Sequence, residues 1–327
     1  MPGTRFTAAV ALCAFAAVPV AGQPALGLPL ECTLGTDCHI QQLVDRDPGP
    51  GAADFACGGL TYDGHRGTDF ALPTLAALER DVPVIAAAPG TVLGLRDGMD
   101  DFLQGVPGAP DIEGRECGNG VLLDHGDGWV TQYCHLARGS IAVRRGDAVE
   151  RGQRLGTVGL SGQTEFPHVH LAVRRGDTVI DPFDLDGQHS CGAQPDPADT
   201  LWIETPEYVP GGLIAAGYWP GIPEYANVKA GSAAATRLET DSPGIVLWGY
   251  AFGGRAGDVM EITILAPDGR IVIRTEAELE RAQAQYYRAR GLRRPDAGWP
   301  PGLYSGTVRL LRGGAEIDRL EATLTVE

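Results

Sequence analysis

The sequence predicts a mainly β protein with two folded domains, and three observations support this. The chain has 327 residues, about twice the length of a typical single domain. It contains 46 glycines and 24 prolines, which favour frequent turns over long helices. Short apolar runs alternate with glycine turns over residues 61–183, and longer apolar runs typical of buried strands follow further along. We therefore expect a barrel or sandwich of short strands, followed by a second β-sandwich.

Composition and charge limit the partners that this chain can have. Hydrophobic residues make up 43% and charged residues 21%, which is typical of folded globular domains. The chain has 42 acidic and 26 basic residues, giving a net charge of −16. Such a charge repels phosphate backbones and anionic lipid surfaces. We expect no nucleic-acid partner and no stable membrane insertion.

Residues 1–22 have the arrangement of a secretory signal peptide. Arg5 precedes an apolar stretch over residues 6–18, and small residues follow up to Gly22. The apolar stretch is too short to cross a bilayer as a helix, and no later segment is long and apolar enough. We expect cleavage near Gly22 and export of the chain.

Cysteine usage agrees with an exported protein. Beyond residue 22 the chain has an even number of cysteines, which favours disulfides, and no CxxC pair that would favour a metal site. These cysteines are Cys32, Cys38, Cys57, Cys117, Cys134 and Cys191. We expect Cys32 to pair with Cys38 across a small loop, and we favour Cys117 with Cys134 because they flank an apparent hairpin. The connectivity as a whole stays open.

The first half of the chain divides into an arm and a domain. Residues 23–56 are rich in proline and glycine and predict an extended arm, whereas residues 57–186 predict a folded β domain. Within that domain, residues 120–134 form a hairpin signal around the turn HGDG. An irregular insert over residues 96–117 carries six acidic residues. It is a candidate lid or calcium loop, and a solvated surface excursion is the favoured alternative.

The second half predicts a different β domain. Residues 187–200 have the composition of a linker. Residues 201–327 contain several buried-strand patterns and predict an immunoglobulin-like β-sandwich, with a helix over residues 276–290. Residues 201–327 contain no histidine and no cysteine, so we place the chemistry in the first domain. Trp299 and Tyr304 are candidates for stacking on sugar rings.

Histidine and aspartate spacing in the first domain indicates a metal site. His65 and Asp69 lie four residues apart in HRGTD, and His168 and His170 lie two apart in HVH. On a strand, both spacings place the two side chains on one face. Imidazole and carboxylate are ordinary zinc ligands, and three protein ligands leave a fourth position open to water. Between these two motifs in the sequence, His135 stands in YCH.

These motifs, in this order, resemble the lysostaphin-type (LytM-like) zinc metallopeptidases, a family of peptidoglycan endopeptidases. The resemblance runs from about residue 64 to 182 and comprises HRGTDF, NGVLLDHGDG, TQYCHL, VRRGDAVERGQRLGTVGLSG and PHVHLAVR. It implies an open β-barrel or sandwich catalytic domain in which one Zn²⁺ is held by three residues. These are His65, Asp69 and His170. It also implies that His135 and His168 are the two catalytic histidines.

One departure from the family pattern concerns the last motif. The family usually has HLH followed by Phe-Glu, whereas here HVH is followed by Leu-Ala. The missing glutamate is not a metal ligand in that pattern, so the departure puts specificity in doubt more than catalysis.

The resemblance implies a secreted zinc endopeptidase that hydrolyses peptide cross-links of bacterial peptidoglycan, through stem peptides or cross-bridges. Zinc-bound water, whose pKa falls to about 7, would attack the peptide carbonyl with the help of two histidines. His168 is the candidate base, and His135 would stabilise the oxyanion or protonate the leaving amine, although the two roles can be exchanged. Asn119 is a possible substrate contact.

Several alternatives remain open at this stage. The chain is alternatively a non-catalytic or occluded family member that regulates or activates other cell-wall hydrolases. The C-terminal sandwich is a candidate site for a glycan or a regulatory protein. We prefer the periplasm of a Gram-negative bacterium as the location, with the extracellular space as the alternative. The bond cleaved and the oligomeric state are not determined by the sequence.

Overall fold

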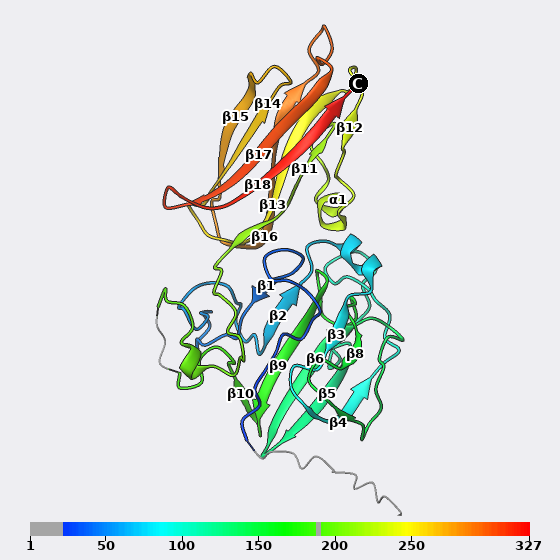
Figure 1. The fold of residues 1–327 in the computed structure, drawn as a ribbon, viewed down its shortest axis with the longest axis vertical. Helices are drawn as coiled ribbons and strands as arrows, with labels where there is room; N and C mark the ends of the chain where they lie inside the picture. The colour runs from blue at the N-terminus through cyan, green and yellow to red at the C-terminus, as the bar shows by residue number, and fades with distance from the viewer. Residues whose placement is uncertain (1–21, 188–190) are drawn as a thin grey trace, which may run out of the picture.

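The computed structural model describes residues 22–187 and 191–327 and is mainly β (Figure 1). The expected signal peptide, except for Gly22, and residues 188–190 of the expected linker lie outside the described residues. Within the described part of the chain, no helix has the length and apolar character needed to cross a membrane.

One large antiparallel sheet dominates the first half of the chain. Its order is β1-β2-β9-β6-β5-β4-β7, and β10 pairs with β9. The strands are β1 (His39–Gln42), β2 (Thr68–Ala71), β4 (Gly90–Arg96), β5 (Asn119–Gly126), β6 (Trp129–Leu136), β7 (Ala148–Val149), β9 (His168–Arg175) and β10 (Thr178–Ile180). A two-stranded sheet, β3 (Pro83–Ile85) with β8 (Arg154–Thr157), contributes Val84 and Leu155 to the same hydrophobic core. The first-domain core therefore includes side chains from both sheets.

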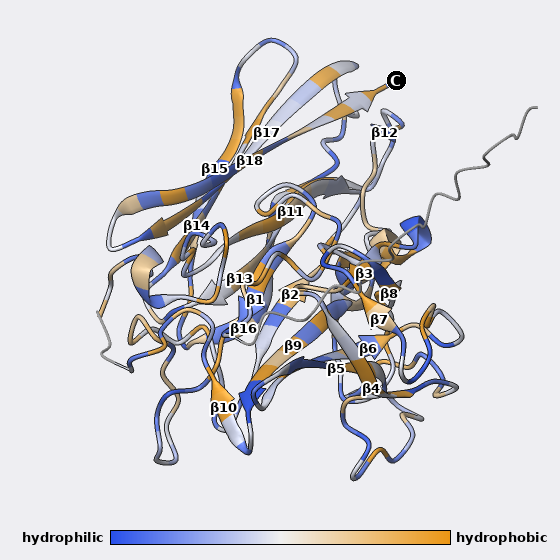
Figure 2. Ribbon diagram, turned by 60° about the horizontal axis from the view of Figure 1, so that its bottom comes forward, coloured by the Kyte–Doolittle hydropathy of each residue, from blue (hydrophilic) through white to orange (hydrophobic). Residues whose placement is uncertain are grey.

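Strand alternation separates the core from the face that carries the histidines. In β9, Val169, Leu171 and Val173 are at most 1% exposed and belong to the core. His168 and His170 alternate with them and therefore project from the opposite face of the sheet. Figure 2 shows the same interleaving of hydrophobic and hydrophilic residues along strands of both domains.

The expected N-terminal arm is part of the first folded unit. β1 forms an edge of the large sheet, and Leu26, Leu30 and Leu43 are buried in its core. The boundary expected at residue 57 therefore does not separate two structural units. The reason is that apolar side chains are present in this proline- and glycine-rich segment, and burying them in the core is favourable.

Three disulfides are present among the described residues. They are Cys32–Cys38, Cys57–Cys191 and Cys117–Cys134. The first and third are the pairings that the sequence favoured. The second ties the segment before β2 to the linker.

The second half of the chain is a sandwich of two sheets. One sheet has the order β11-β13-β16 and the other β12-β18-β17-β14-β15. The strands are β11 (Gly212–Trp219), β12 (Arg237–Leu238), β13 (Gly244–Gly254), β14 (Val259–Leu265), β15 (Ile271–Glu278), β16 (Gln283–Arg293), β17 (Gly302–Arg312) and β18 (Ala315–Val326). Leu247, Ile262 and Val308, from both sheets, are each 0% exposed in one shared core.

The strand order of this sandwich is immunoglobulin-like. The first, third and sixth strands of the domain form one sheet, which corresponds to strands A, B and E of that fold. The hydroxyl of Tyr304, at the start of β17, donates to the carbonyl of Pro300 at 3.0 Å, as in a tyrosine corner. Tyr304 and Trp299 are 1% and 4% exposed, so neither is available to stack on a sugar ring.

The helix expected over residues 276–290 is wrong. This segment forms the end of β15 and most of β16, and β16 pairs with β13 along its length. Its glutamates, glutamines and alanines favour a helix by local propensity. Pairing with a fully buried strand, together with burial of Tyr286 in the sandwich core, overrides that propensity. The short helices of the described residues are η1 (Leu75–Arg80), η2 (Pro197–Asp199) and α1 (Tyr225–Ala230).

The sandwich packs directly against the end of the first unit that carries β1 (Figure 1). The ring of His39 lies 4.5 Å from the ring of Phe252, centroid to centroid. The side-chain amide of Gln285 donates to the side chain of Gln41 at 2.9 Å. β1, an edge strand of the large sheet, therefore lies next to the second domain.

Candidate metal centre and its flanking histidines

Three predicted metal ligands converge on one point of the large sheet. Asp69 in β2 and His170 in β9 are cross-strand neighbours, and His65 lies in the turn before β2. Asp69 Oδ1 lies 2.7 Å from His170 Nδ1 and 3.2 Å from His65 Nε2, and the two imidazole nitrogens are 3.2 Å apart. The donor atoms of all three residues lie within 4.8 Å of one another.

This donor set fits a cation. His65 Nδ1 lies 2.6 Å from the carbonyl oxygen of Leu43, so this nitrogen carries the proton and Nε2 turns a lone pair toward Asp69. Asp69 is 3% exposed, and a buried carboxylate needs a positive partner. Two imidazoles and one carboxylate, with a fourth position open, are the ligands expected of a catalytic zinc site.

The pKa shifts of Asp69 and His65 also indicate that this site needs a positive charge. Burial opposes ionisation of Asp69, but the neighbouring imidazoles hold its pKa well below the ordinary value. Burial lowers the pKa of His65, yet the Asp69 carboxylate outweighs burial and raises it overall. Without a metal, a proton on His65 would take the place of the cation.

A glycine makes room for the third ligand. A Cβ at Gly67 would lie 2.6 Å from two ring atoms of His170 and 2.7 Å from the carbonyl of Leu171. A side chain at this position would push His170 away from Asp69. The glycine inside HRGTD is thus required by the close approach of the ligand ring.

Two further histidines stand beside the ligand cluster. The rings of His135 and His168 are 4.6 Å apart, and those of His135 and His170 are 6.1 Å apart. His168 Nδ1 lies 2.9 Å from the carbonyl of Phe166, and His135 Nδ1 lies 2.8 Å from the carbonyl of Ser161. Each ring therefore donates from Nδ1 and leaves Nε2 unprotonated.

Burial governs the protonation of both flanking rings. His135 and His168 are 6% and 4% exposed. Burial lowers the pKa of each, and the neighbouring imidazoles push that of His135 lower still, whereas Asp69 partly offsets the effect at His168. Both rings are neutral at pH 7 and able to accept a proton.

Two aromatic residues that the sequence reasoning missed border this site. Tyr62 is 53% exposed, and its ring lies 4.5 Å from that of His65. Phe166 stacks on His168 at 4.4 Å. Their positions in sequence, three residues before His65 and two before His168, are the signal that would have found them.

The structure does not support a substrate contact for Asn119. Its side chain is 0% exposed, accepts from the backbone N–H of Met99, and donates to the carbonyls of Met99 and Leu136. Asn119 ties the start of the acidic insert to the end of β6 and faces no open space.

The acidic insert itself packs against the loops that flank the histidines. Asp101 accepts from the N–H groups of Leu160 and Arg138, at 2.6 and 2.9 Å, and Asp97 accepts from Gly139 at 2.8 Å. These carboxylates are occupied by backbone donors, which argues against a calcium loop. The insert is a surface excursion, as the favoured alternative expected, and its carboxylates brace the neighbouring loops.

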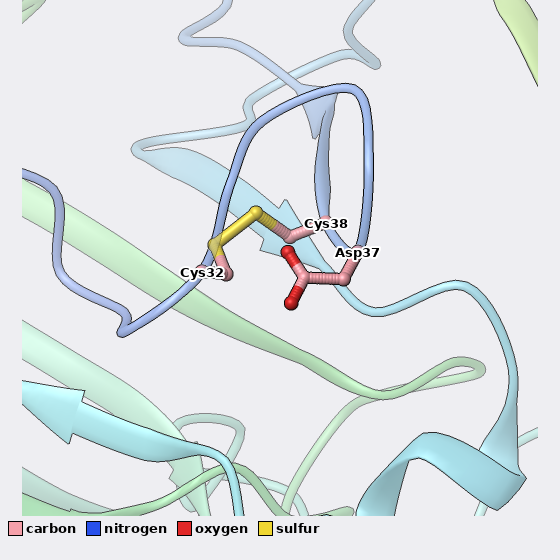
Figure 3. Close-up of side chains that lie close together, drawn as sticks. All are labelled: Cys32, Asp37 and Cys38. Atoms are coloured by element: carbon pink, nitrogen blue, oxygen red, sulfur yellow. A yellow bond between two sulfur atoms is a disulfide. The ribbon is translucent and has the colours of Figure 1, made fainter.

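Two other groups of metal-type side chains occur in the described residues. In the first, Cys32 and Cys38 are bonded to each other beside Asp37, so their sulfurs are not metal ligands (Figure 3). The second consists of carboxylates near Arg46 and contains no histidine. Its members are Asp184, Asp186 and Asp199.

Comparison with known proteins identifies the domain that carries this site. Residues 63–182 match the model of peptidase family M23, and that range contains the three predicted metal ligands and both flanking histidines. Residues 63–182 therefore form an M23 peptidase domain.

Individual relatives cover only part of the chain. The peptidoglycan DD-endopeptidase ShyA of Vibrio cholerae is 35% identical over 106 residues, which are 32% of this chain and 19% of that protein. The cell division protein DipM of Caulobacter vibrioides is 44% identical over 64 residues, 20% of this chain and 10% of that protein. A solved structure of a putative M23 peptidase from Pseudomonas aeruginosa is 27% identical, with a TM-score of 0.30, covering 50% of this chain and 51% of the other. The chain thus spans a fifth or less of these two curated relatives.

Proposed function

We propose that the protein is a zinc-dependent endopeptidase that hydrolyses peptide cross-links of bacterial peptidoglycan. The observation that carries this proposal is the convergence of His65, Asp69 and His170 beside two further buried imidazoles. The substrate class is supported by the names of relatives such as ShyA, a peptidoglycan DD-endopeptidase.

His65, Asp69 and His170 would hold one zinc ion. When bound there, zinc would polarise the scissile carbonyl and lower the pKa of water toward neutrality. The three residues come from two paired strands and one tight turn, so their positions are fixed before any metal binds. The carbonyl of Leu43 accepts a hydrogen bond from Nδ1 of His65, which fixes the tautomer of this ligand.

The two flanking histidines would move protons and stabilise charge. We assign His168 as the base that takes the proton of the attacking water, because its free Nε2 lies on the side of Asp69, 3.7 Å from Oδ1. We assign His135 to the oxyanion and the leaving amine, because it stands beside His168 and presents a second free Nε2. Exchanging these two roles would leave the overall chemistry the same.

We further propose that the protein works outside the cytoplasm, in the periplasm of a Gram-negative bacterium. The N-terminal arrangement of a signal peptide, the three disulfides and a peptidoglycan substrate all agree with export. A glycan or a regulatory protein is the partner that we propose for the C-terminal sandwich.

Mass spectrometry of the soluble products from purified sacculi tests the activity. The zinc-loaded full chain is expected to convert cross-linked dimers into monomers, and His65→Ala protein is expected to release none. The masses of the products identify the bond that is cleaved. If the zinc-loaded chain releases no product, the endopeptidase proposal fails.

That failure would favour the second candidate, a non-catalytic regulator of other hydrolases. A specific observation keeps this candidate in view, because the 44% identical relative DipM is named a cell division protein and not a peptidase. The discriminating measurement adds the chain to sacculi together with another cell-wall hydrolase. A regulator raises the release of soluble products by that hydrolase, and the His65→Ala variant of the chain should do so equally well.

A further inference from the structure

Strand β6 contains a bulge at one of the two flanking histidines. Two residues of β6, Cys134 and His135, stand opposite the single residue Gly120 of β5. His135 has a φ of 66°, in the left-handed region that residues with a Cβ rarely adopt. A residue other than glycine stays in such a backbone conformation only where its surroundings enforce it.

The segment just before β5 enforces this conformation. The carbonyl of Cys117 accepts the backbone N–H of His135 at 2.9 Å. The same segment packs against Ser161, whose carbonyl accepts from the imidazole of His135 at 2.8 Å. The packing is tight, because a Cβ at Gly118 would lie 2.3 Å from the backbone of Ser161. The segment therefore controls both the backbone of His135 and the position of the group that orients its ring.

A disulfide ties that segment to the bulge. Cys117 is bonded to Cys134, the residue directly before His135. The segment follows the acidic insert, so without this bond only non-covalent contacts would hold it against β6. Cys134 is also the cross-strand neighbour of His170, which places the bond on the face of the sheet that carries the metal ligands.

We propose that Cys117 and Cys134 are positioning residues whose disulfide holds His135 in its left-handed bulge beside the metal site. The effect on turnover rests on the proposed endopeptidase function, whereas the effect on the bulge does not. The three predicted metal ligands lie on other elements than the bonded segment, namely on β2, on β9 and in the turn before β2. Loss of the disulfide should therefore lower kcat and spare both zinc binding and KM.

The test compares two double variants of the full chain. Cys117→Ala/Cys134→Ala removes the proposed positioning bond, and Cys32→Ala/Cys38→Ala removes the disulfide of the N-terminal loop as the matched control. For each protein we would measure zinc content, kcat and KM on a cross-linked muropeptide dimer. Hydrogen exchange of the His135 backbone amide, resolved by mass spectrometry or NMR, reports on the bulge without any activity.

The proposal predicts that the first variant loses about tenfold or more in kcat, the scale of a misplaced acid–base group, with KM and one zinc retained. Exchange at the His135 amide should rise by a similar factor. The control should match the wild-type protein in all four quantities. Unchanged exchange at His135 overturns the proposal, and so does a parallel loss of zinc and turnover, which would show general collapse of the site.

Two further arms keep the proposal decidable. If the double variant fails to fold, native-state reduction of the wild-type protein replaces it. Alkylation of Cys117 then identifies the molecules in which this bond is open. Faster His135 exchange in those molecules supports the proposal, and unchanged exchange refutes it. If the wild-type protein cleaves no dimer, the proposed function fails, and the exchange measurement still decides the positioning role.

Discussion

At the scale of single residues, the site depends on which nitrogen of each histidine is free. The backbone carbonyls of Leu43, Ser161 and Phe166 each lie within hydrogen-bond distance of one Nδ1. These carbonyls belong to loops outside the strands that carry Asp69 and His170. The loops therefore fix the same tautomer in all three rings, with Nε2 free.

The first prediction concerns His168. Replacing it by alanine should lower turnover by about 10²-fold or more, because the base is lost. Zinc content should stay at one per chain, because His168 is not in the ligand cluster. Activity assays and metal analysis on the same sample check this, with His39→Gln as a control at the domain interface. A His168→Ala protein that remains active would refute the assigned role.

The second prediction concerns Gly67. The Cβ of Gly67→Ala would meet the ring of His170 at 2.6 Å, so the ligand must shift. We expect zinc affinity to fall by about tenfold to a hundredfold, the scale of other changes that misorient a ligand. Gly59→Ala is the matched control, because nothing lies within 4 Å of its Cβ. Competition with a chromophoric chelator measures both affinities, and equal values would contradict the account.

At the scale of elements, the large sheet and the turn before β2 provide the predicted ligands. The insert between β4 and β5 supports the loops that hold the flanking histidines. Asp101 of the insert binds the loop after β6 and the loop before β9 with its two carboxylate oxygens. The insert thus joins two loops that are distant in sequence and adjacent in space.

The third prediction follows from this role of the insert. Asp101→Ala removes two charge-assisted hydrogen bonds at a solvent-exposed position, so we expect a loss of about 1–2 kcal/mol in unfolding free energy. Asp100→Ala is the control, because Asp100 has 76% of its side chain exposed and pairs with Arg138 on the surface; such a pair contributes at most about 1 kcal/mol. Urea unfolding compares the two variants, and equal stabilities would refute the bracing role.

At the scale of the whole molecule, burial of Asp181 at the end of the first domain links stability to pH. Asp181 is 2% exposed, and burial raises its pKa to about 7 even though Arg46 lies 3.6 Å away. The folded state therefore holds a proton on Asp181 that the unfolded state releases near pH 4. The stabilisation from this proton is complete below pH 4 and is lost as pH rises from about 4 to about 7.

The fourth prediction is that Asp181→Asn removes this component of the pH dependence. Between pH 4 and 7 the unfolding free energy of the wild-type protein should fall relative to the variant by at most about 1.4 kcal/mol per pH unit. Chemical denaturation at a series of pH values gives the difference. Parallel curves for the two proteins would show that Asp181 ionises normally in the folded state.

Sequence reasoning could predict the parts of this molecule that local spacing determines. The two-residue period of HVH placed His168 and His170 on one face, and the structure brings both next to Asp69. It could not predict features that depend on distant chain segments. The strand at residues 283–293 forms because a buried strand pairs with it, and Asn119 is saturated by groups on the insert and β6. The left-handed backbone of His135 is likewise enforced by Cys117 and Ser161, which no local pattern reveals.

A zinc titration of the metal-free full chain, with cleavage of a cross-linked muropeptide dimer followed at each step, tests the central claim most directly. The account predicts binding of one zinc per chain, with activity rising in proportion to occupancy and reaching its plateau at one equivalent. Asp69→Asn protein should show weaker binding and little activity. Failure of the wild-type chain to bind zinc, or cleavage that does not depend on the bound zinc, would contradict the account.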